Sequence, residues 1–312
     1  MLTPAQIEER RGYIGASEAA GVLGLSRWQT PLSIWAAKTG MLPPEDKSGE
    51  LAIEVGNDLE DCVARLFAKR TGKQVRRVNE TIRHPEYPFL AVNLDRKVVS
   101  EDADLECKTA SAYKDREWED DAIPVEYLIQ CQHSMGVTGK KANYIACLIG
   151  GNVSFQYKLI ERDDALIRDM FEKEIHFWNT YVVPKVMPQI VTARDAGIIN
   201  RLYPEDPAAA PAVTLSADHD RIAAGIKAME KDKKRIEELI EKEKNYIRLA
   251  LGSATEGATA GYRLTWKEQS PMLLDQERLK SEAPTIYEKY LKPSPRRPLY
   301  ITPIKPPKPS KT

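Results

Sequence analysis

The clearest pattern of apolar and polar positions in the chain predicts a helix over residues 51–71. Leu59, Val63 and Phe67 follow one another at intervals of four, which places them on one face of a helix. Gly72 comes directly after this segment and is suited to end it. We therefore expect an amphipathic helix that packs its apolar face against a core.

Two shorter helices are predicted before it. Residues 16–24 (ASEAAGVLG) begin near Ser17, whose hydroxyl is suited to cap free amide groups. Residues 30–40 (TPLSIWAAKTG) have Pro31 in the first turn and Gly40 at the end, an arrangement that is typical of helices.

The pattern then changes to that of strands. Residues 73–111 predict three strands, with turns at HPEYP and SEDAD. A helix is expected over 126–139, an apolar hairpin over 142–160 that turns at 150–152, and an amphipathic helix over 161–183. The order helix, strands, helix, strands, helix favours an α/β fold with a mixed central sheet flanked by helices.

The composition changes after this core. Residues 203–213 (YPEDPAAAPAV) are rich in Pro and Ala, which is typical of a linker. The charged helix predicted over 216–251 has an apolar stripe, a coiled-coil or helix-hairpin pattern, made by Ile222, Ile226, Met229, Ile236, Leu239, Ile240 and Ile247. A small strand pair over 257–266 and a short helix over 274–291 follow.

These changes divide the chain into a main domain and an extension. The main domain spans 1–202 and the linker 203–213. The extension comprises a coiled-coil-like helical segment over 214–252, a small α+β element over 253–303 and a basic Pro-rich tail over 304–312.

Charge and cysteine usage narrow the class of protein. The 46 basic and 46 acidic residues cancel, but 65–77 and 292–312 each hold six basic residues and no acid. Such stripes are suited to phosphate binding, although a solvated surface is the alternative.

The four cysteines lack a CxxC spacing and the four histidines form no metal-binding pair, so we expect reduced thiols and no zinc site. No apolar run is long enough to span a bilayer, and we expect a cytoplasmic protein without a membrane partner.

Candidate chemistry gathers in NLDRKVVSEDADLECKTAS (93–111). Side chains alternate along a strand, so Glu106 and Lys108 project from one face. The SEDAD turn brings Asp95 close to them. Two carboxylates and a main-chain carbonyl suit a hard cation such as Mg²⁺, and the lysine can hold a water or offset phosphoryl charge. The alternative is an exposed strand edge with a surface ion pair.

Three further polar residues extend this cluster. Glu60 lies on the helix that precedes the sheet, where a surface position is the alternative. Gln130 and Gln132 lie among apolar residues of the helix that follows the strand. Buried glutamines require partners, and a metal–water network would supply them.

The chain resembles a known family, the YqaJ-type phage recombinase nucleases, which are relatives of lambda exonuclease in the PD-(D/E)xK nuclease superfamily. The resemblance covers roughly residues 10–180 and rests on five motifs in order: RRGYIGASEAAGVLGLSRWQTPLSIWAAKTG, GNDLEDCVARLFAKRTG, HPEYPFLAVNLDRKV, LECKTAS and EYLIQCQHSMGVTG. The segment YRLTWKEQS and the later YEKYLKPSPRR also look like the tail of phage-type members. The resemblance implies a PD-(D/E)xK nuclease core over 1–202.

The resemblance also implies roles for the cluster. Asp95 and Glu106 match the metal-binding acids, the Cys107 carbonyl matches the main-chain ligand, and Lys108 matches the catalytic lysine. Glu60 matches the helix acid that helps hold a second metal.

A glutamine and a phosphate pocket complete the expected site. Gln132 matches the family's active-site glutamine, with Gln130 as the second register. Arg10, Ser17 and Lys114 match the residues that grip a DNA 5′-phosphate. Lys114 departs from the family's arginine, so it offers a point charge in place of bidentate contact.

Together these features predict a Mg²⁺-dependent exonuclease, with two ions and Mn²⁺ as a substitute. It would resect double-stranded DNA ends 5′ to 3′ in the cytoplasm of a bacterial host, leaving 3′ single strands for recombination. A single-strand annealing protein is the candidate partner, and relatives include ring-shaped trimers. A structure- or site-selective endonuclease and a non-catalytic DNA-binding recombination accessory are the alternatives.

Overall fold

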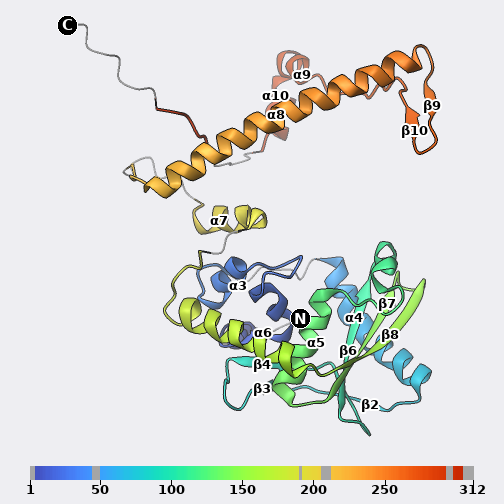
Figure 1. Cartoon of the computed structure of the whole chain (residues 1–312), viewed down its shortest axis with the longest axis vertical. Helices are drawn as coiled ribbons and strands as arrows, with labels where there is room; N and C mark the ends of the chain where they lie inside the picture. The colour runs from blue at the N-terminus through green and yellow to red at the C-terminus, as the bar shows by residue number, and fades with distance from the viewer. Residues whose placement is uncertain (1–3, 44–49, 190–191, 205–211, 293–297, 305–312) are drawn as a thin grey trace. The chain divides into compact units, whose positions relative to one another are not determined.

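The computed structural model divides the chain into two compact units, Met1–Pro204 and Glu205–Thr312 (Figure 1). It describes residues 4–43, 50–189, 192–204, 212–292 and 298–304. Most of the predicted linker 203–213 and of the basic tail 304–312 therefore lies outside the described residues, and so does much of the basic stripe 292–312.

A mixed five-stranded sheet forms the centre of the first unit. Its order is β2 (Val75–Arg77), β5 (Arg96–Val98), β6 (Ala103–Ala110), β7 (Ala142–Ile149) and β8 (Ser154–Glu161). β6 and β7 run parallel, and the other neighbours are antiparallel. The predicted α/β fold with a mixed sheet is confirmed, but the segment 73–111 forms five strands instead of three.

The two faces of this sheet meet different helices (Figure 1). β7 (ANYIACLI) is apolar almost throughout, as a strand buried on both faces should be. Ala146 and Leu148 pack with Val63 and Phe67 of α4 (Leu51–Thr71). The alternate residues, Ile145 and Cys147 among them, belong to the larger core that includes Cys131 and Met135 of α5 (Val125–Thr138). The helix predicted over 51–71 is therefore confirmed.

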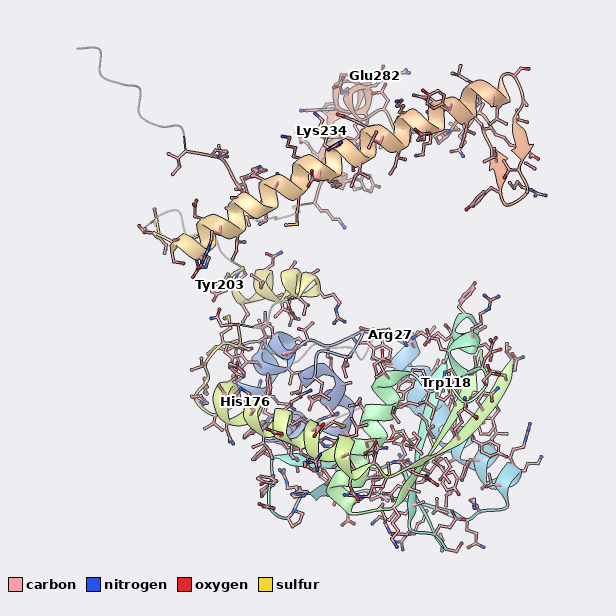
Figure 2. All side chains as sticks on the ribbon, viewed as in Figure 1. Arg27, Trp118, His176, Tyr203, Lys234 and Glu282 are labelled. Atoms are coloured by element: carbon pink, nitrogen blue, oxygen red, sulfur yellow. The ribbon has the colours of Figure 1, made fainter. Side chains whose placement is uncertain are left out.

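A second sheet continues the core. β4 (Leu90–Asn93) pairs with β1 (Ile14–Gly15) in parallel and with β3 (Thr81–Arg83) in antiparallel fashion. α2 (Ala16–Val22) and α3 (Pro31–Lys38) add their buried faces to the same core. Trp118 is fully buried there (Figure 2). The remaining elements of the first unit are α1 (Pro4–Arg11), η1 (Ala112–Trp118), α6 (Asp164–Phe177), the π-turn η2 (Trp178–Val182), η3 (Ala193–Asp195) and α7 (Ala196–Leu202).

The start of α2 differs from the expectation. Gly15 is the N-cap residue, and its backbone N–H donates to the Glu18 carboxylate at 2.8 Å. Ser17 is exposed inside the helix and is not the cap. Glu18, three residues after the N-cap, accepts the hydrogen bond from the Gly15 N–H, as the third helical residue of a capping box does. The hydroxyl of Ser17 is therefore not needed to cap this helix.

The second unit is built around a long helix. α8 (Ala217–Leu251) is followed by the antiparallel pair β9 (Glu256–Ala258) and β10 (Arg263–Thr265) and by α9 (Gln276–Glu282) and α10 (Pro284–Tyr290). No residue of α8 is buried, and its side chains, Lys234 among them, project along its length (Figure 2). Pro284 lacks the backbone donor that a continuous helix would need, so the single helix predicted over 274–291 is two helices. Within the described ranges, no helix has the length and apolar character to cross a membrane.

A buried ion pair joins α5 to α6 and β4. Nδ1 of His133 lies 3.0 Å from Glu174, and Nε2 lies 3.2 Å from the carbonyl oxygen of Ala91. Both side chains are fully buried. Burial opposes the imidazolium, but the charge and hydrogen bond of Glu174 outweigh it, so the pKa of His133 is raised. Each ring nitrogen of His133 faces a hydrogen-bond acceptor, so the doubly protonated imidazolium can donate a hydrogen bond from both nitrogens.

We predict that this pair makes stability depend on pH. Because the folded-state pKa of His133 is raised, its contribution is complete below the ordinary pKa of about 6.5 and is lost as pH rises through the folded value. Glu174→Gln should lower the free energy of unfolding by about 3–5 kcal/mol at low pH, as breaking a buried pair does. The difference from wild type should shrink as pH rises, measured by denaturant unfolding. A difference that is constant with pH would contradict this role.

Candidate active site

The central strand β6 places an acid and a base side by side. Leu105 and Cys107 face the apolar cluster under α4, so Glu106 and Lys108 project from the opposite face toward α5. The Nζ atom of Lys108 lies 2.7 Å from Oε1 of Glu106. Only 6% of the Glu106 side chain and 20% of the Lys108 side chain is exposed, which excludes the alternative of a fully solvated surface pair.

Asp95 reaches the same place from the junction between the two sheets. It follows β4 and precedes β5, and its Oδ2 accepts a hydrogen bond of 2.8 Å from the backbone N–H of Cys107. Burial and the nearby charge of Glu106 raise the pKa of Asp95 to about 8, against the opposing effects of Lys108 and the Cys107 amide. The two acids are thus close enough to repel each other when both are ionised.

Lys108 supplies the positive charge of the cluster. Burial disfavours the ammonium form, but the charges of Glu106 and Asp95 outweigh burial, and the pKa of Lys108 is raised. Its Nζ atom also lies 5.2 Å from the ring centre of Tyr127 on α5, a cation–π distance. The lysine is therefore protonated at neutral pH and lies between an acid and an aromatic ring.

Glu60 approaches the cluster from α4 but is bound by an arginine. Nη1 of Arg96 lies 2.6 Å from Oε1 of Glu60 and 2.6 Å from the carbonyl oxygen of Asp95, while Nη2 binds Asp61. The charge of Glu60 contributes to the raised pKa of Asp95, so the helix acid lies within electrostatic reach. The sequence did not predict this role of Arg96, because the acids that it binds lie 35 and 36 residues away in the chain.

The donor set fits a hard divalent cation with two carboxylates and a carbonyl. Among the described residues, no group of three His, Cys, Asp or Glu side chains is placed to hold a metal together. Asp95 and Glu106 instead form a pair of partly or fully buried acids, a set that Mg²⁺ prefers when a main-chain oxygen such as that of Cys107 joins it. Glu60 could contribute only by exchanging its contact with Arg96.

The two glutamines of α5 make different contacts, and the glutamine that acts at the site stays a prediction. Nε2 of Gln130 lies 2.5 Å from Oε1 of Glu106. Gln132 donates to the Glu161 carbonyl oxygen at 2.8 Å and accepts from the Asp163 N–H at 3.0 Å. Residues two apart on a helix point in nearly opposite directions, so only one of the pair can reach the cluster. That residue is Gln130, the register ranked second from the sequence.

The three residues that were expected to bind a 5′-phosphate lie on three different elements. Arg10 lies on α1, with its carbonyl oxygen 2.6 Å from Nζ of Lys38, and Ser17 is exposed on α2. Lys114 lies on η1, with its Nζ atom 5.1 Å from the ring centre of Trp28. In the described part of the chain, no hydrogen bond or ion pair links Arg10, Ser17 and Lys114, and their common role stays a prediction.

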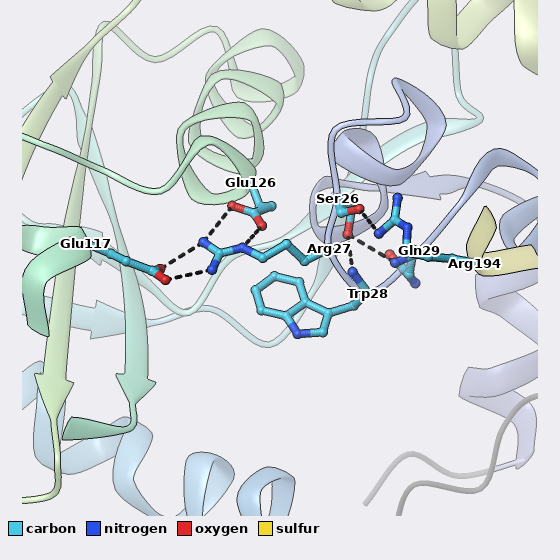
Figure 3. Close-up of polar contacts among 7 residues, drawn as sticks. All are labelled: Ser26, Arg27, Trp28, Gln29, Glu117, Glu126 and Arg194. Carbon is cyan, nitrogen blue, oxygen red and sulfur yellow. Dashed lines mark hydrogen bonds and ion pairs between the residues drawn. The ribbon is translucent and has the colours of Figure 1, made fainter. Parts of the chain in front are cut away.

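Arg27 binds two acids beside the cluster, a set of contacts that we call the Arg27 brace and that the sequence did not predict. Arg27 lies 2.7 Å from Glu117 of η1 and 2.5 Å from Glu126 of α5 (Figure 3). Glu126 is almost fully buried, with 4% of its side chain exposed. The brace ties the segment before α3 to both elements that follow β6, and contacts across 90 or more residues leave no local signal in a sequence.

Comparisons with known proteins agree with this architecture. Residues 7–141 match the family model of the YqaJ-like viral recombinase domain. The protein YqaJ of Bacillus subtilis (strain 168) is 41% identical over 291 residues, which are 91% of this chain and 89% of that protein. The crystal structure of an alkaline exonuclease (LHK-Exo) from Laribacter hongkongensis shares the fold, with a TM-score of 0.51 and 20% identity over 59% of this chain and 94% of that chain. Its complex with dAMP gives a TM-score of 0.50 at 20% identity, again over 59% of this chain and 94% of that chain.

The different contacts of the two glutamines give a matched pair of variants. Gln130→Ala should weaken Mn²⁺ binding by about 10–100-fold, because it removes a hydrogen-bond partner from a carboxylate that we expect to ligate the metal. Gln132→Ala removes the same side chain from the same helix without touching Glu106, and its Mn²⁺ affinity should equal that of wild type. Isothermal titration calorimetry measures both. A loss only in Gln132→Ala would favour Gln132 as the site glutamine, and an equal loss in the two variants would contradict a selective role for Gln130.

Proposed function

Because the chain belongs to the YqaJ-like viral recombinase family, we propose that it is a metal-dependent deoxyribonuclease that resects duplex DNA ends 5′ to 3′. The observation that carries this proposal is the contact of Lys108 with Glu106, 2.7 Å apart, beside Asp95 on one face of the sheet. Two acids and a protonated lysine form a compact site that suits phosphodiester hydrolysis.

Each residue of the cluster has a task in this proposal. Asp95, Glu106 and the Cys107 carbonyl would hold Mg²⁺, with Mn²⁺ as a substitute and Glu60 as the acid for a second ion. When bound, the metal supplies Lewis-acid stabilisation of the phosphoryl oxygens. Lys108 orients the attacking water and offsets the charge that develops on the phosphate. Gln130 holds Glu106 in place through the amide contact at 2.5 Å.

The substrate is proposed from charge and fold. Basic residues on the edge strand β2 and its neighbour β5 line a surface cavity of about 260 Å³, with Arg76, Arg77 and Lys97 among its walls. Such a basic edge suits the sugar–phosphate backbone of DNA. An exonuclease of the same fold is known in complex with dAMP, so we propose a nucleotide end as the ligand class for this chain. A single-strand annealing protein as partner and the cytoplasm of a bacterial host as location complete the proposal.

The first test compares linear with covalently closed plasmid in Mg²⁺. We expect release of nucleotides from linear duplex only, and Lys108→Ala should lower the rate by about 10²–10³-fold because it removes a charge stabiliser from the site. Lys140→Ala is the matched control, since that lysine pairs with Asp102 on the exposed surface. Rapid cutting of closed circles would favour an endonuclease, and a near wild-type rate for Lys108→Ala would remove the basis of the proposal.

A second test examines the proposed 5′-phosphate contact. Resection should be faster from 5′-phosphorylated than from 5′-hydroxyl ends, and Arg10→Ala should erase that difference. A general backbone contact would slow both substrates equally and change the salt slope by roughly one unit. Rates on both end types, for wild type and Arg10→Ala, separate these outcomes. Equal rates in wild type would contradict recognition of the end.

A further inference from the structure

A tryptophan lies exposed beside the proposed active site. Trp28 is 56% exposed, although large aromatic side chains are usually well covered. It belongs to the segment between α2 and α3, which is the segment that Arg27 braces (Figure 3). The sequence motif that contains it, GLSRWQTP, has no role in the cluster described above.

The exposed ring is connected to the catalytic lysine through one other ring. Trp28 stacks on Tyr127, with ring centres 6.1 Å apart and an angle of 29° between the planes. Tyr127 in turn contacts Lys108 Nζ at 5.2 Å and packs against the buried Trp118 at 5.8 Å. The indole therefore lies one aromatic residue away from the lysine that we place at the scissile phosphate.

A cation is placed over the same indole. Nζ of Lys114 lies 5.1 Å from the ring centre of Trp28, within the cation–π range. Lys114 is only partly buried and belongs to the short helix η1, so its flexible side chain can exchange the ring for a phosphate. An aromatic face and a mobile cation side by side match the two halves of a nucleotide, its base and its phosphate.

The backbone around Trp28 is held in place. Oγ of Ser26 accepts from the N–H groups of Trp28 and Gln29 at 3.1 and 3.2 Å, and the Ser26 carbonyl oxygen accepts from Arg194 at 2.5 Å (Figure 3). Arg27 adds the two ion pairs to Glu117 and Glu126. An exposed ring on a fixed backbone loses little freedom when it meets a ligand, as a stacking platform requires.

We propose that Trp28 is a stacking platform for the base of the 5′-terminal nucleotide, whose phosphate meets Lys114. The site would take any base, because every nucleobase offers a flat π-face and the indole offers no pattern of hydrogen bonds to select among them. It would, however, reject an end nucleotide that lacks a base. This inference rests on the proposed function only for its choice of DNA end.

The proposed stacking on Trp28 is tested by measuring DNA binding under conditions that do not support cleavage. Three blunt duplexes differ only in the 5′-terminal nucleotide, which carries adenine, 2-aminopurine or no base. Ca²⁺ replaces Mg²⁺, because its looser oxygen coordination should support binding without cleavage. Wild type should bind the adenine duplex about 5- to 150-fold more tightly than the abasic duplex, the range that one stacked base contributes. The fluorescence of 2-aminopurine should be quenched on binding.

Three variants separate stacking from a general effect on the fold. Trp28→Ala should bind all three duplexes as weakly as wild type binds the abasic one, and it should abolish the quenching. Trp28→Phe keeps a π-face and should retain most of the preference. Trp266→Ala removes another exposed tryptophan, 47% exposed in the second unit, and should leave the preference intact.

The outcomes also distinguish this inference from the proposed function. Equal affinities of wild type for the adenine and abasic duplexes, or a preference that persists in Trp28→Ala, would overturn the platform even if linear DNA is resected in Mg²⁺. A preference that disappears in Trp28→Ala would support the platform even if no nuclease activity is found. Absence of binding to all three duplexes would overturn it.

Discussion

The close approach of two acids is the constraint on which this structure depends. Burial raises the pKa of Asp95, and the nearby charge of Glu106 raises it further. Such a pair is unfavourable unless cations and hydrogen-bond donors surround it. Lys108, the Cys107 amide and the Gln130 amide serve this purpose, and each comes from an element whose position the fold determines. A divalent cation fits this donor set, and we propose that the cluster binds one.

The surrounding strands and helices hold the residues of this cluster in place. Asp95 lies where the chain passes from the smaller sheet to the larger one, so both sheets contribute to its placement. α4 covers one face of β6 with apolar side chains and brings Glu60 to its edge, where Arg96 binds it. α5 covers the other face and supplies Gln130 and Tyr127. The Arg27 brace then links the segment before α3 to η1 and α5.

Local patterns predicted most of the first unit. The apolar spacing of Leu59, Val63 and Phe67 located α4, and strand alternation was enough to place Glu106 and Lys108 on one face. The motif resemblance identified the family to which the chain belongs.

The expectations from the sequence differ from the structure where contacts between distant residues decide which of two neighbouring residues is used. Gln130 and Gln132 have equivalent neighbours in the sequence, and only the position of β6 selects Gln130. Ser17 was a reasonable cap by residue type, but Glu18 provides the contact to the Gly15 N–H. Arg96 and Arg27 bind acids that are 36 and 99 residues away, which no spacing rule anticipates.

The most direct test of the central claim is an X-ray structure of crystals soaked in Mn²⁺, with anomalous scattering used to locate the ion. The account predicts an anomalous peak bounded by the carboxylates of Asp95 and Glu106 and the carbonyl oxygen of Cys107, at oxygen distances of roughly 2.0–2.3 Å, near those of Mg²⁺ and Ca²⁺ sites. A second peak beside Glu60, with Arg96 displaced from that acid, would identify the second ion. No peak between Asp95 and Glu106, in crystals that bind Mn²⁺ elsewhere, would contradict a metal-dependent active site on β6.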